Sequence, residues 1–275
     1  MRTLEISSEF PQLATDEVHI FCMPLSFDID EVETWDALLS EDERDKAARF
    51  VFEKDRARYI TCRGMLRRLL GAYLRIDPST LRFFYGHFGK PGLSSYVDRR
   101  LRFTLSHAGD WVAYAVSEDR EVGIDIEKRR DDVSWRELAP LVFSPNERAE
   151  FDVIPGPEKA DCFLRGWTRK EAYVKARGDG LSCPLDTFDV PLQTLEAGNP
   201  VAIREAHGGP SGWTLHPLDL IDGFLSALVV KGPPARISVC GETAWAELTQ
   251  DPNPALFGEP DSAARSFSTA SLGAR

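Results

Sequence analysis

Cysteine, basic charge and long apolar segments are all scarce in this sequence of 275 residues, and each shortage excludes a class of protein. The five cysteines include no Cys-x-x-Cys spacing, which argues against a disulfide framework and a zinc site and favours a reducing cytoplasm. Lys and Arg number 33 against 44 Asp and Glu, and a net charge of -11 makes the chain a poor general binder of nucleic acid. The longest strongly apolar run, residues 223–230, is too short to span a bilayer, and residues 1–17 lack a signal-peptide pattern. We therefore expect no membrane partner.

What the sequence contains is the composition of a globular protein. Hydrophobic residues make up 43% of the chain and charged residues 28%, enough for one large domain or two ordinary ones. Because the total charge is acidic, a polyanionic ligand would have to meet a local group of Lys and Arg. Proline, alanine and serine become frequent near the end, so we expect an extension over 233–275 that is partly disordered, mainly over 251–275.

Two long helical segments are predicted, over residues 38–74 and 161–177. The first contains a capping-box pattern, Ser40 followed by Glu43, and the second is closed by glycines just beyond it. A shorter helix is predicted to begin at Ser144. Alternating and β-branched residues predict strands at 101–105, 111–116, 121–127, 213–215 and 224–230.

The predicted elements repeat along the chain. An Arg-Gly pair followed by two basic residues occurs in both long helices, around Gly64 and around Gly166, and a similar pair of strands follows each helix. One interpretation is chance similarity between two amphipathic helices. The other is a duplicated α+β unit, with halves at residues 1–120 and 121–232 and a ligand cleft between them.

Asp125 and Glu127 form the first candidate site. Both lie in a predicted strand where Ile and Val alternate with acids, so the two carboxylates share one face about 7 Å apart. Converging carboxylates repel each other unless a cation is present, and Mg²⁺ commonly uses one or two of them together with phosphates. The alternative is a half-exposed strand with its polar face in water.

Glu171 and Lys175 form the second candidate site, on the second long helix. Their spacing of four residues puts a carboxylate and an ammonium on one face, suited to act beside a reacting phosphate. The alternative is a surface salt bridge worth about 0.2–0.5 kcal/mol. Trp167 precedes Glu171 by four residues and is compatible with core packing.

Several polar residues outside these two pairs could meet phosphate. Ser106 and His107 end a predicted strand, where a ring N–H could contact an anion, and no Gly-x-Ser-x-Gly elbow surrounds them. Lys90 lies in a Gly-Lys-Pro turn, and Lys46 and Arg58 lie in the first helical segment. Each of these side chains could equally be solvated and without a ligand.

The order and spacing of these motifs resemble the Sfp-type branch of the 4′-phosphopantetheinyl transferase superfamily. The resemblance covers about residues 38–230. It is carried by seven short stretches: residues 123–127, 167–175, 89–91, 103–107, 49–50, 180–182 and 185–188.

The resemblance implies two α+β halves related by a pseudo-two-fold axis, with coenzyme A in the cleft between them. It implies a Mg²⁺-dependent transfer of phosphopantetheine from coenzyme A to a serine of an apo acyl or peptidyl carrier protein. We expect a monomer, because duplicated halves would form the cleft within one chain. The implied metal ligands are Asp125, Glu127 and Glu171. The implied catalytic residues are Glu171, as proton acceptor, and Lys175. Lys175 would stabilise charge on the transferring or leaving phosphate, and His107, with Ser106, would meet the 3′-phosphate of coenzyme A. Lys46, Arg58 and Lys90 would contact its other phosphates or the nucleotide.

One position departs from the family pattern. A lysine expected early in the first helical segment aligns with Glu43, which puts one phosphate contact in doubt. Two other functions stay open from the residues alone: a Mg²⁺-dependent phosphohydrolase that uses the same carboxylates, and a catalytically silent module that binds coenzyme A. The particular carrier protein is not evident from the sequence.

Overall fold

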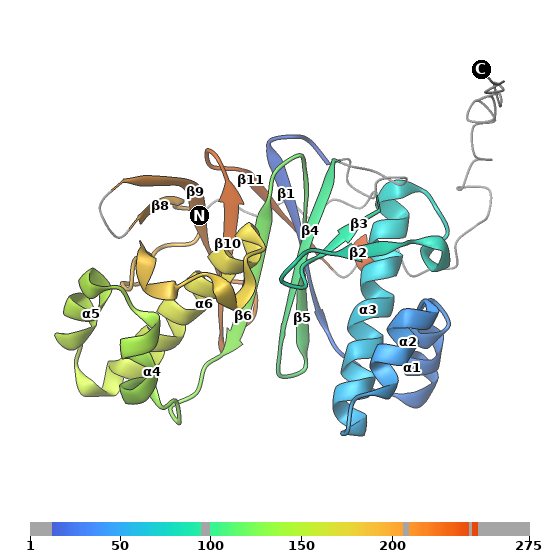
Figure 1. The fold of residues 1–275 in the computed structure, drawn as a ribbon, viewed down its shortest axis with the longest axis horizontal. Coiled ribbons are helices and arrows are strands. Elements are labelled where there is room, and N and C mark those ends of the chain that lie inside the picture. Colours follow the sequence, from blue (N-terminus) through green and yellow to red (C-terminus); the bar gives the residue numbers. More distant parts are fainter. Residues whose placement is uncertain (1–12, 95–99, 206–208, 242–243, 247–275) are drawn as a thin grey trace, which may run out of the picture.

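The computed structural model describes residues 13–94, 100–205, 209–241 and 244–246, and it consists of two α+β halves side by side (Figure 1). The first half contains these elements: β1 (Glu17–Pro24), α1 (Ile29–Asp36), α2 (Glu41–Ala48), α3 (Glu53–Leu74), β2 (Phe83–Tyr85), β3 (Pro91–Leu93), β4 (Leu101–Ala108) and β5 (Trp111–Glu118). The second half follows: β6 (Val122–Lys128), α4 (Trp135–Val142), α5 (Pro145–Asp152), α6 (Lys159–Arg177), β7 (Phe188–Asp189), β8 (Val201–Glu205), β9 (Pro210–Leu218) and β10 (Phe224–Lys231). A last strand is β11 (Arg236–Cys240).

The two halves share one topology, which confirms the predicted duplication. The first sheet has the strand order β11-β1-β5-β4 and the second has the order β6-β10-β9-β8-β7. In each half the opening strand, β1 or β6, pairs antiparallel with the closing strand, β5 or β10. The closing strand then pairs antiparallel with the strand before it, β4 or β9.

Side-chain alternation gives each sheet two apolar faces. In β1, Val18 and Ile20 join an apolar cluster with Ile124 and Leu228 of the second sheet, so the two sheets pack against each other. Phe21, on the opposite face of β1, packs with α3. In the second half α6 covers the outer face in the same way. The long helices therefore lie on the faces turned away from the sheet-to-sheet contact.

The expectation of one helical segment over 38–74 was wrong in one respect. The segment is split into α2 and α3, and the chain between them is extended at Phe52. Val51 in this connection is 91% exposed, so no packing holds it in a helix. Glu53 and Asp55 then occupy the first turn of α3, where acidic side chains favour a helix start.

Three elements near the ends of the chain were not predicted: β1, α1 and β11. β11 lies within the predicted extension, yet it pairs parallel with β1 of the first sheet. Trp245 also packs into the core of the first half, near Phe21 and Tyr114. The predicted disorder of residues 251–275 concerns positions outside the described residues. The boundaries of the halves at 120 and 232 stay a prediction.

Among the described helices, none has the length and apolar character required to cross a membrane. All five cysteines are free thiols, and four of them are buried.

Candidate active site

The two halves meet along a seam where β4 and β6 lie next to each other (Figure 1). Each is an edge strand of its own sheet. Arg102 Nε lies 2.9 Å from Glu121 Oε1, and four residues farther along both strands Ser106 Oγ donates to Asp125 Oδ1 at 2.8 Å. The equal spacing means that the two strands run in the same direction, with polar side chains joining them.

Asp125 lies at the centre of the candidate site. Its Oδ1 accepts hydrogen bonds from Ser106 Oγ at 2.8 Å and from Lys175 Nζ at 2.7 Å, and Lys175 Nζ also donates to Ser106 Oγ at 2.8 Å. Its Oδ2 is buried and has no hydrogen-bond partner. Burial raises the pKa of Asp125, although Lys175 and Ser106 oppose that shift. A buried carboxylate oxygen without a partner is the kind of group that a cation satisfies.

Glu127 and Glu171 lie close enough to Asp125 for their charges to interact with it. Burial raises the pKa of both carboxyl groups, and the charge of Asp125 raises them further. Trp167 Nε1 donates to Glu127 Oε1 at 3.2 Å, so this indole both packs in the second half and orients an acid. Sequence reasoning treated Trp167 as core packing and missed the second role.

Gly123 brings the helix that carries Glu171 and Lys175 close to β6. A Cβ atom at Gly123 would lie 2.1 Å from the carbonyl oxygen of Ala172 and 2.3 Å from the backbone nitrogen of Ala176. Only glycine allows α6 to pack at this distance. The glycine of the Gly-Ile-Asp-Ile-Glu stretch is therefore required for helix packing, a reason that the sequence pattern did not reveal.

These residues fit a divalent cation by their chemistry, although they are not yet arranged around one. Within the described part of the chain, no group of three or more His, Cys, Asp and Glu side chains is positioned to hold a metal ion. Against this, Asp125 Oδ2 lacks a partner, and the charge of Asp125 raises the pKa of both Glu127 and Glu171. Hard divalent ions favour such oxygen ligands. In this arrangement Lys175 supplies the positive charge nearest to Asp125.

Arg58 and His107 meet at a second place, a pocket of about 190 Å³ between α3 and the end of β4. Arg58 Nη1 lies 3.0 Å from Asp55 Oδ1. Partial burial lowers the pKa of His107, as do the positive charges of Arg58 and Lys175. A bound anion would favour the protonated form of His107 and so raise its pKa again, which makes the pocket suitable for a phosphate. The pocket is lined by Phe50, Asp55, Arg58, Tyr59, Cys62, Arg63, Leu105 and His107.

The structure places the two predicted lysines differently. Lys46 Nζ lies 5.3 Å from the ring centre of Tyr59, so Lys46 is beside the pocket of Arg58 and His107. Lys90 Nζ instead donates to the carbonyl oxygens of Ala176 at 2.9 Å and Val122 at 3.3 Å. Lys90 lines a separate cavity of about 660 Å³. Its predicted phosphate contact stays a prediction, and the contacts seen here join the two halves.

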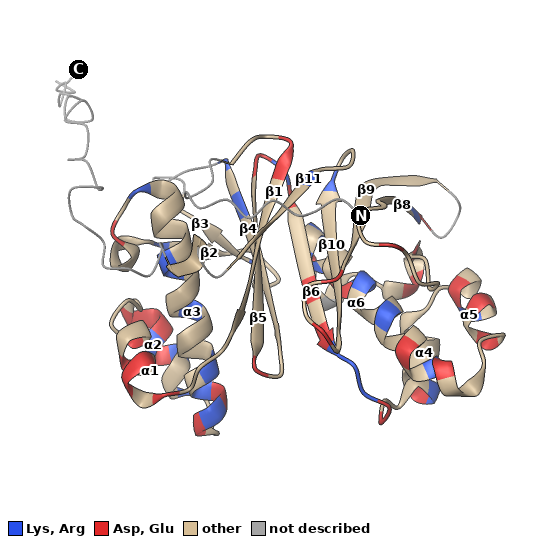
Figure 2. Ribbon diagram, turned by 180° about the vertical axis from the view of Figure 1, so that it is seen from behind, with Lys and Arg blue, Asp and Glu red and all other residues tan. Residues whose placement is uncertain are grey.

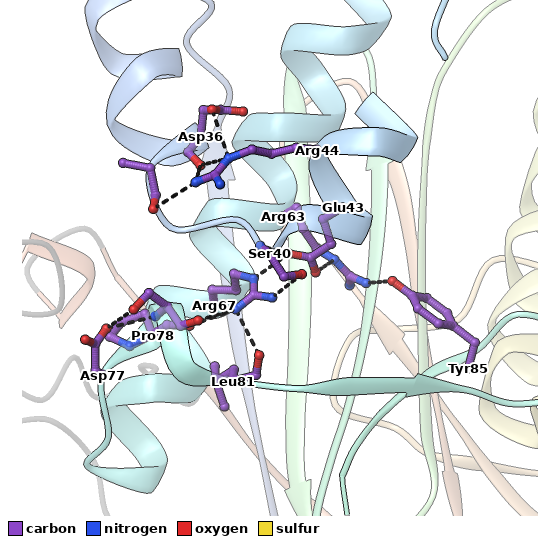
Figure 3. A network of polar contacts seen from close by, with 12 residues as sticks. Asp36, Ser40, Glu43, Arg44, Arg63, Arg67, Asp77, Pro78, Leu81 and Tyr85 are labelled. Carbon is purple, nitrogen blue, oxygen red and sulfur yellow. Dashed lines mark hydrogen bonds and ion pairs between the residues drawn. The ribbon is translucent and has the colours of Figure 1, made fainter. Parts of the chain in front are cut away.

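Glu43, the departure from the family pattern, is a structural residue. Its side chain is 1% exposed and lies 2.6 Å from Nε of both Arg63 and Arg67, as Figure 3 shows. Its Oε2 also accepts the backbone N–H of Ser40 at 3.0 Å, which completes the predicted capping box. Two arginines neutralise this carboxylate, so it adds little repulsion to an anion in the nearby pocket.

Charge is unevenly spread over the molecule. Figure 2 shows acidic and basic residues mixed on the helices, whereas the strands of both sheets carry few charges. Among the described strands β6 carries two acids, Asp125 and Glu127, whereas β1, β5, β7 and β8 carry one each. Strand β6 ends at the exposed Lys128, and the connection after it begins with the exposed Arg129 and Arg130.

The polar cluster lies between two similar α+β halves, and comparison with known proteins gives the family. Residues 121–230 match the model of the 4′-phosphopantetheinyl transferase superfamily, and residues 29–119 match that of the 4′-phosphopantetheinyl transferase N-terminal region. The 4′-phosphopantetheinyl transferase HetI of Nostoc sp. is 35% identical over 221 residues, which cover 80% of this chain and 90% of HetI. The chain belongs to the 4′-phosphopantetheinyl transferase superfamily.

Two further relatives carry the same activity in their names. The 4′-phosphopantetheinyl transferase Sfp of Bacillus subtilis is 33% identical over 163 residues, covering 59% of this chain and 70% of Sfp. The 4′-phosphopantetheinyl transferase AcpT of Escherichia coli is 41% identical over 123 residues, covering 45% of this chain and 58% of AcpT. The resemblance inferred from the motifs is thereby confirmed, and the roles of single residues stay predictions.

Proposed function

We propose that this chain transfers the 4′-phosphopantetheine group of coenzyme A to a serine hydroxyl of an apo acyl or peptidyl carrier protein, with Mg²⁺ as cofactor. The observation that carries the proposal is the cluster of Asp125, Glu171 and Lys175 at the seam, with one Asp125 oxygen left unpaired. A binding module would need neither this buried acid nor its pairing with a lysine from another element.

Each residue has a role that its surroundings support. Asp125, Glu127 and Glu171 would hold Mg²⁺, which when bound acts as a Lewis acid on phosphate oxygens. Glu171 would also accept the serine proton, directly or through a water molecule. Lys175 would stabilise negative charge on the transferring phosphate.

The second pocket suits the 3′-phosphate of coenzyme A. Arg58 and His107 line it, and Lys46 lies beside it. The serine oxygen would attack the β-phosphorus, the bridging P–O bond would break, and adenosine 3′,5′-bisphosphate would leave with the bond's electron pair. Phosphoryl transfer depends mainly on positioning and electrostatic stabilisation, which such a set of charges supplies.

The test is a mass measurement of the carrier. The chain is incubated with coenzyme A, Mg²⁺ and an apo carrier protein, and the carrier is weighed before and after. We expect the added mass of one phosphopantetheine group, lost when Mg²⁺ is chelated or when the carrier serine is replaced by alanine. An unchanged carrier with phosphate released from small esters would instead indicate a phosphohydrolase, and tight coenzyme A binding without either reaction would indicate a silent module.

The same experiment with a panel of carriers would identify the physiological partner. Peptidyl, polyketide and fatty-acid carriers are all candidates. Modification of an acyl carrier protein in this panel would be a holo-acyl-carrier-protein synthase activity. We also propose that the chain acts as a monomer in the cytoplasm. The duplicated halves form the seam within one chain, and the five free thiols suit a reducing compartment.

A further inference from the structure

The three-way contact among Ser106, Asp125 and Lys175 joins three elements from both halves. Ser106 comes from β4, Asp125 from β6 and Lys175 from α6. All three distances fall between 2.7 and 2.8 Å, so Lys175 Nζ is held by Asp125 and Ser106 together. The sequence motifs suggested that Ser106 and Lys175 both meet phosphate. In the structure both are engaged with Asp125 instead.

This contact affects how a metal ion enters. Asp125 Oδ1 already accepts from an ammonium and a hydroxyl. A divalent cation that binds Asp125 would lie next to Lys175, and two cations that share one buried carboxylate repel each other strongly. Among the described residues, no other ion pair neutralises Asp125. Lys175 thus occupies the position of a counter-cation to Asp125.

We infer that Lys175 is the internal cation of the ligand-free site and that Ser106 positions it, so that the metal binds tightly only once an anionic pyrophosphate has drawn Lys175 away from Asp125. The inference rests on the proposed function, because coenzyme A is the source of that pyrophosphate. Metal and coenzyme A therefore bind cooperatively. The ammonium freed from Asp125 becomes available to the phosphate, so one side chain serves both states.

The test measures metal binding rather than activity. Mn²⁺ replaces Mg²⁺ as a spectroscopic probe, and free Mn²⁺ is followed by electron paramagnetic resonance as it is titrated into the full chain, with and without coenzyme A. The variants are Lys175→Met, Ser106→Ala and Lys231→Met. Lys231 is exposed at the end of β10, so Lys231→Met is a control for the loss of one positive charge.

We expect coenzyme A to tighten Mn²⁺ binding to the parent by about 5–150-fold, the usual range of coupling between two ligands. Without coenzyme A, Lys175→Met should bind Mn²⁺ at least about tenfold more tightly than the parent. Coenzyme A should then tighten Mn²⁺ binding by a smaller factor than in the parent, because it still supplies phosphate oxygens to the metal. The Mn²⁺ affinity of Ser106→Ala without coenzyme A should lie between those of the parent and Lys175→Met. The Mn²⁺ affinity of Lys231→Met should match that of the parent. Equal Mn²⁺ affinity in Lys175→Met and Lys231→Met would overturn the inference.

Two safeguards keep the result interpretable. If thermal melting shows that Lys175→Met does not fold, Ser106→Ala decides, and parent-like Mn²⁺ affinity in that variant overturns the inference. Carrier modification is measured on the same preparations. A parent that modifies no carrier but shows the expected Mn²⁺ pattern would refute the transfer function and leave the cation exchange standing. An active parent whose Lys175→Met variant binds Mn²⁺ no more tightly would refute only the exchange.

Discussion

The two halves of this molecule use the same fold for different purposes, and the difference lies on one face of their opening strands. On β1, the face toward α3 carries Phe21 and Met23, which pack in the core of the first half. On β6, the corresponding face toward α6 carries Gly123, Asp125 and Glu127. Duplication thus supplies two similar scaffolds. The site arises where one scaffold has carboxylates in place of core side chains.

A second comparison concerns how each half fixes its long helix. Ser40 and Glu43 form a capping box at α2, and Glu43 binds the buried Arg67 of α3. Ser144 and Glu147 form a capping box at α5, and Glu147 lies 2.8 Å from the buried Lys170 of α6.

In both halves the basic side chain then donates to backbone carbonyls beyond the helix. Arg67 donates to those of Pro78 and Leu81, and Lys170 to those of Leu185 and Phe188. The halves therefore share a structural device as well as a topology, and they differ in its chemistry: Glu43 also pairs with Arg63, whereas Glu147 pairs with one lysine.

The largest expected effect is a contrast between β6 and β1: a substitution on β6 should reduce activity, and one on β1 should reduce stability. Asp125→Ala removes a proposed metal ligand, so single-turnover transfer to an apo carrier should fall about 10²–10⁴-fold, corresponding to roughly 3–5 kcal/mol of barrier. Its stability should fall less than that of Met23→Ala, because burial already disfavours the ionised carboxylate and the Lys175 side chain, which is 30% exposed, can reach water once Asp125 is gone. Met23→Ala, on the matching face of β1, should lose about 2–5 kcal/mol of unfolding free energy and keep the rate of the folded fraction.

Urea unfolding and mass-resolved single turnover on both variants provide the measurement. A folded Asp125→Ala that transfers at close to the parental rate in limiting Mg²⁺ would show that the acidic face of β6 is not the metal site. The contrast between the two opening strands would then lose its functional meaning.

The next effect compares the two buried ion pairs. Glu43→Gln leaves Arg63 and Arg67 buried without a carboxylate, and Glu147→Gln leaves Lys170 in the same condition. Removing one partner of a buried pair typically costs about 3–5 kcal/mol. Glu43→Gln should cost more, because arginine keeps its charge and lysine does not.

The pH dependence of stability distinguishes the two variants. Burial lowers the pKa of Lys170 and Glu147 opposes that shift, so Glu147→Gln lowers the pKa further. The folded variant therefore binds fewer protons than the folded parent, and its stability rises more with pH. The deficit of Glu147→Gln should therefore shrink between pH 7 and pH 9, whereas that of Glu43→Gln should stay constant. Equal, pH-independent deficits in urea unfolding would show that the two pairs do not differ in this way.

Local signals made part of this arrangement predictable. The capping box at Ser40 and Glu43, the repeated Arg-Gly pattern and the Asp-x-Glu strand all depend on residues within a few positions of each other. The structure confirms the box, the two long helices and the duplicated order of elements.

The rest depends on partners far apart in the chain. Glu43 and Arg67 are 24 residues apart, Trp167 and Glu127 are 40 apart, and Lys175 and Asp125 are 50 apart. No periodicity encodes which distant side chain will fill a buried position. The exposed break after α2 was missed for a related reason, since tertiary packing decides where a marginal helix stops.

A smaller effect tests the close approach of α6 to β6. In Gly123→Ala the new methyl group would overlap the backbone at Ala172 and Ala176, and a helix backbone cannot move aside as a side chain can. We expect a loss of about 1–3 kcal/mol or more, with a lower transfer rate because Glu171 and Lys175 shift with the helix. Gly156→Ala is the matched control, since a Cβ there meets no atom within 4 Å.

Thermal melting and single-turnover rates would be compared for the two alanine variants. Parental stability and rate in Gly123→Ala would mean that α6 can withdraw from β6 without consequence. The glycine would then carry no weight in explaining why the second half holds the site.

The smallest expected effect concerns the pocket of Arg58 and His107 in the first half, and how its affinity for coenzyme A depends on pH. In the free protein the pKa of His107 is lowered by partial burial and by the nearby positive charges of Arg58 and Lys175, so the ring is largely neutral at neutral pH. A bound 3′-phosphate would raise that pKa and cause proton uptake.

Affinity for coenzyme A should therefore increase as pH falls through the pKa of His107 in the complex, and level off below its pKa in the free protein. Dephospho-coenzyme A lacks the 3′-phosphate and should show a flatter profile. His107→Gln keeps a hydrogen-bond donor without a titrating ring, so with coenzyme A only the proton exchange of the phosphate itself remains. Calorimetry in buffers of different ionisation enthalpy counts the protons taken up. Equal uptake by the parent and His107→Gln would remove the 3′-phosphate from this pocket, and the second half would then have to hold the whole of coenzyme A.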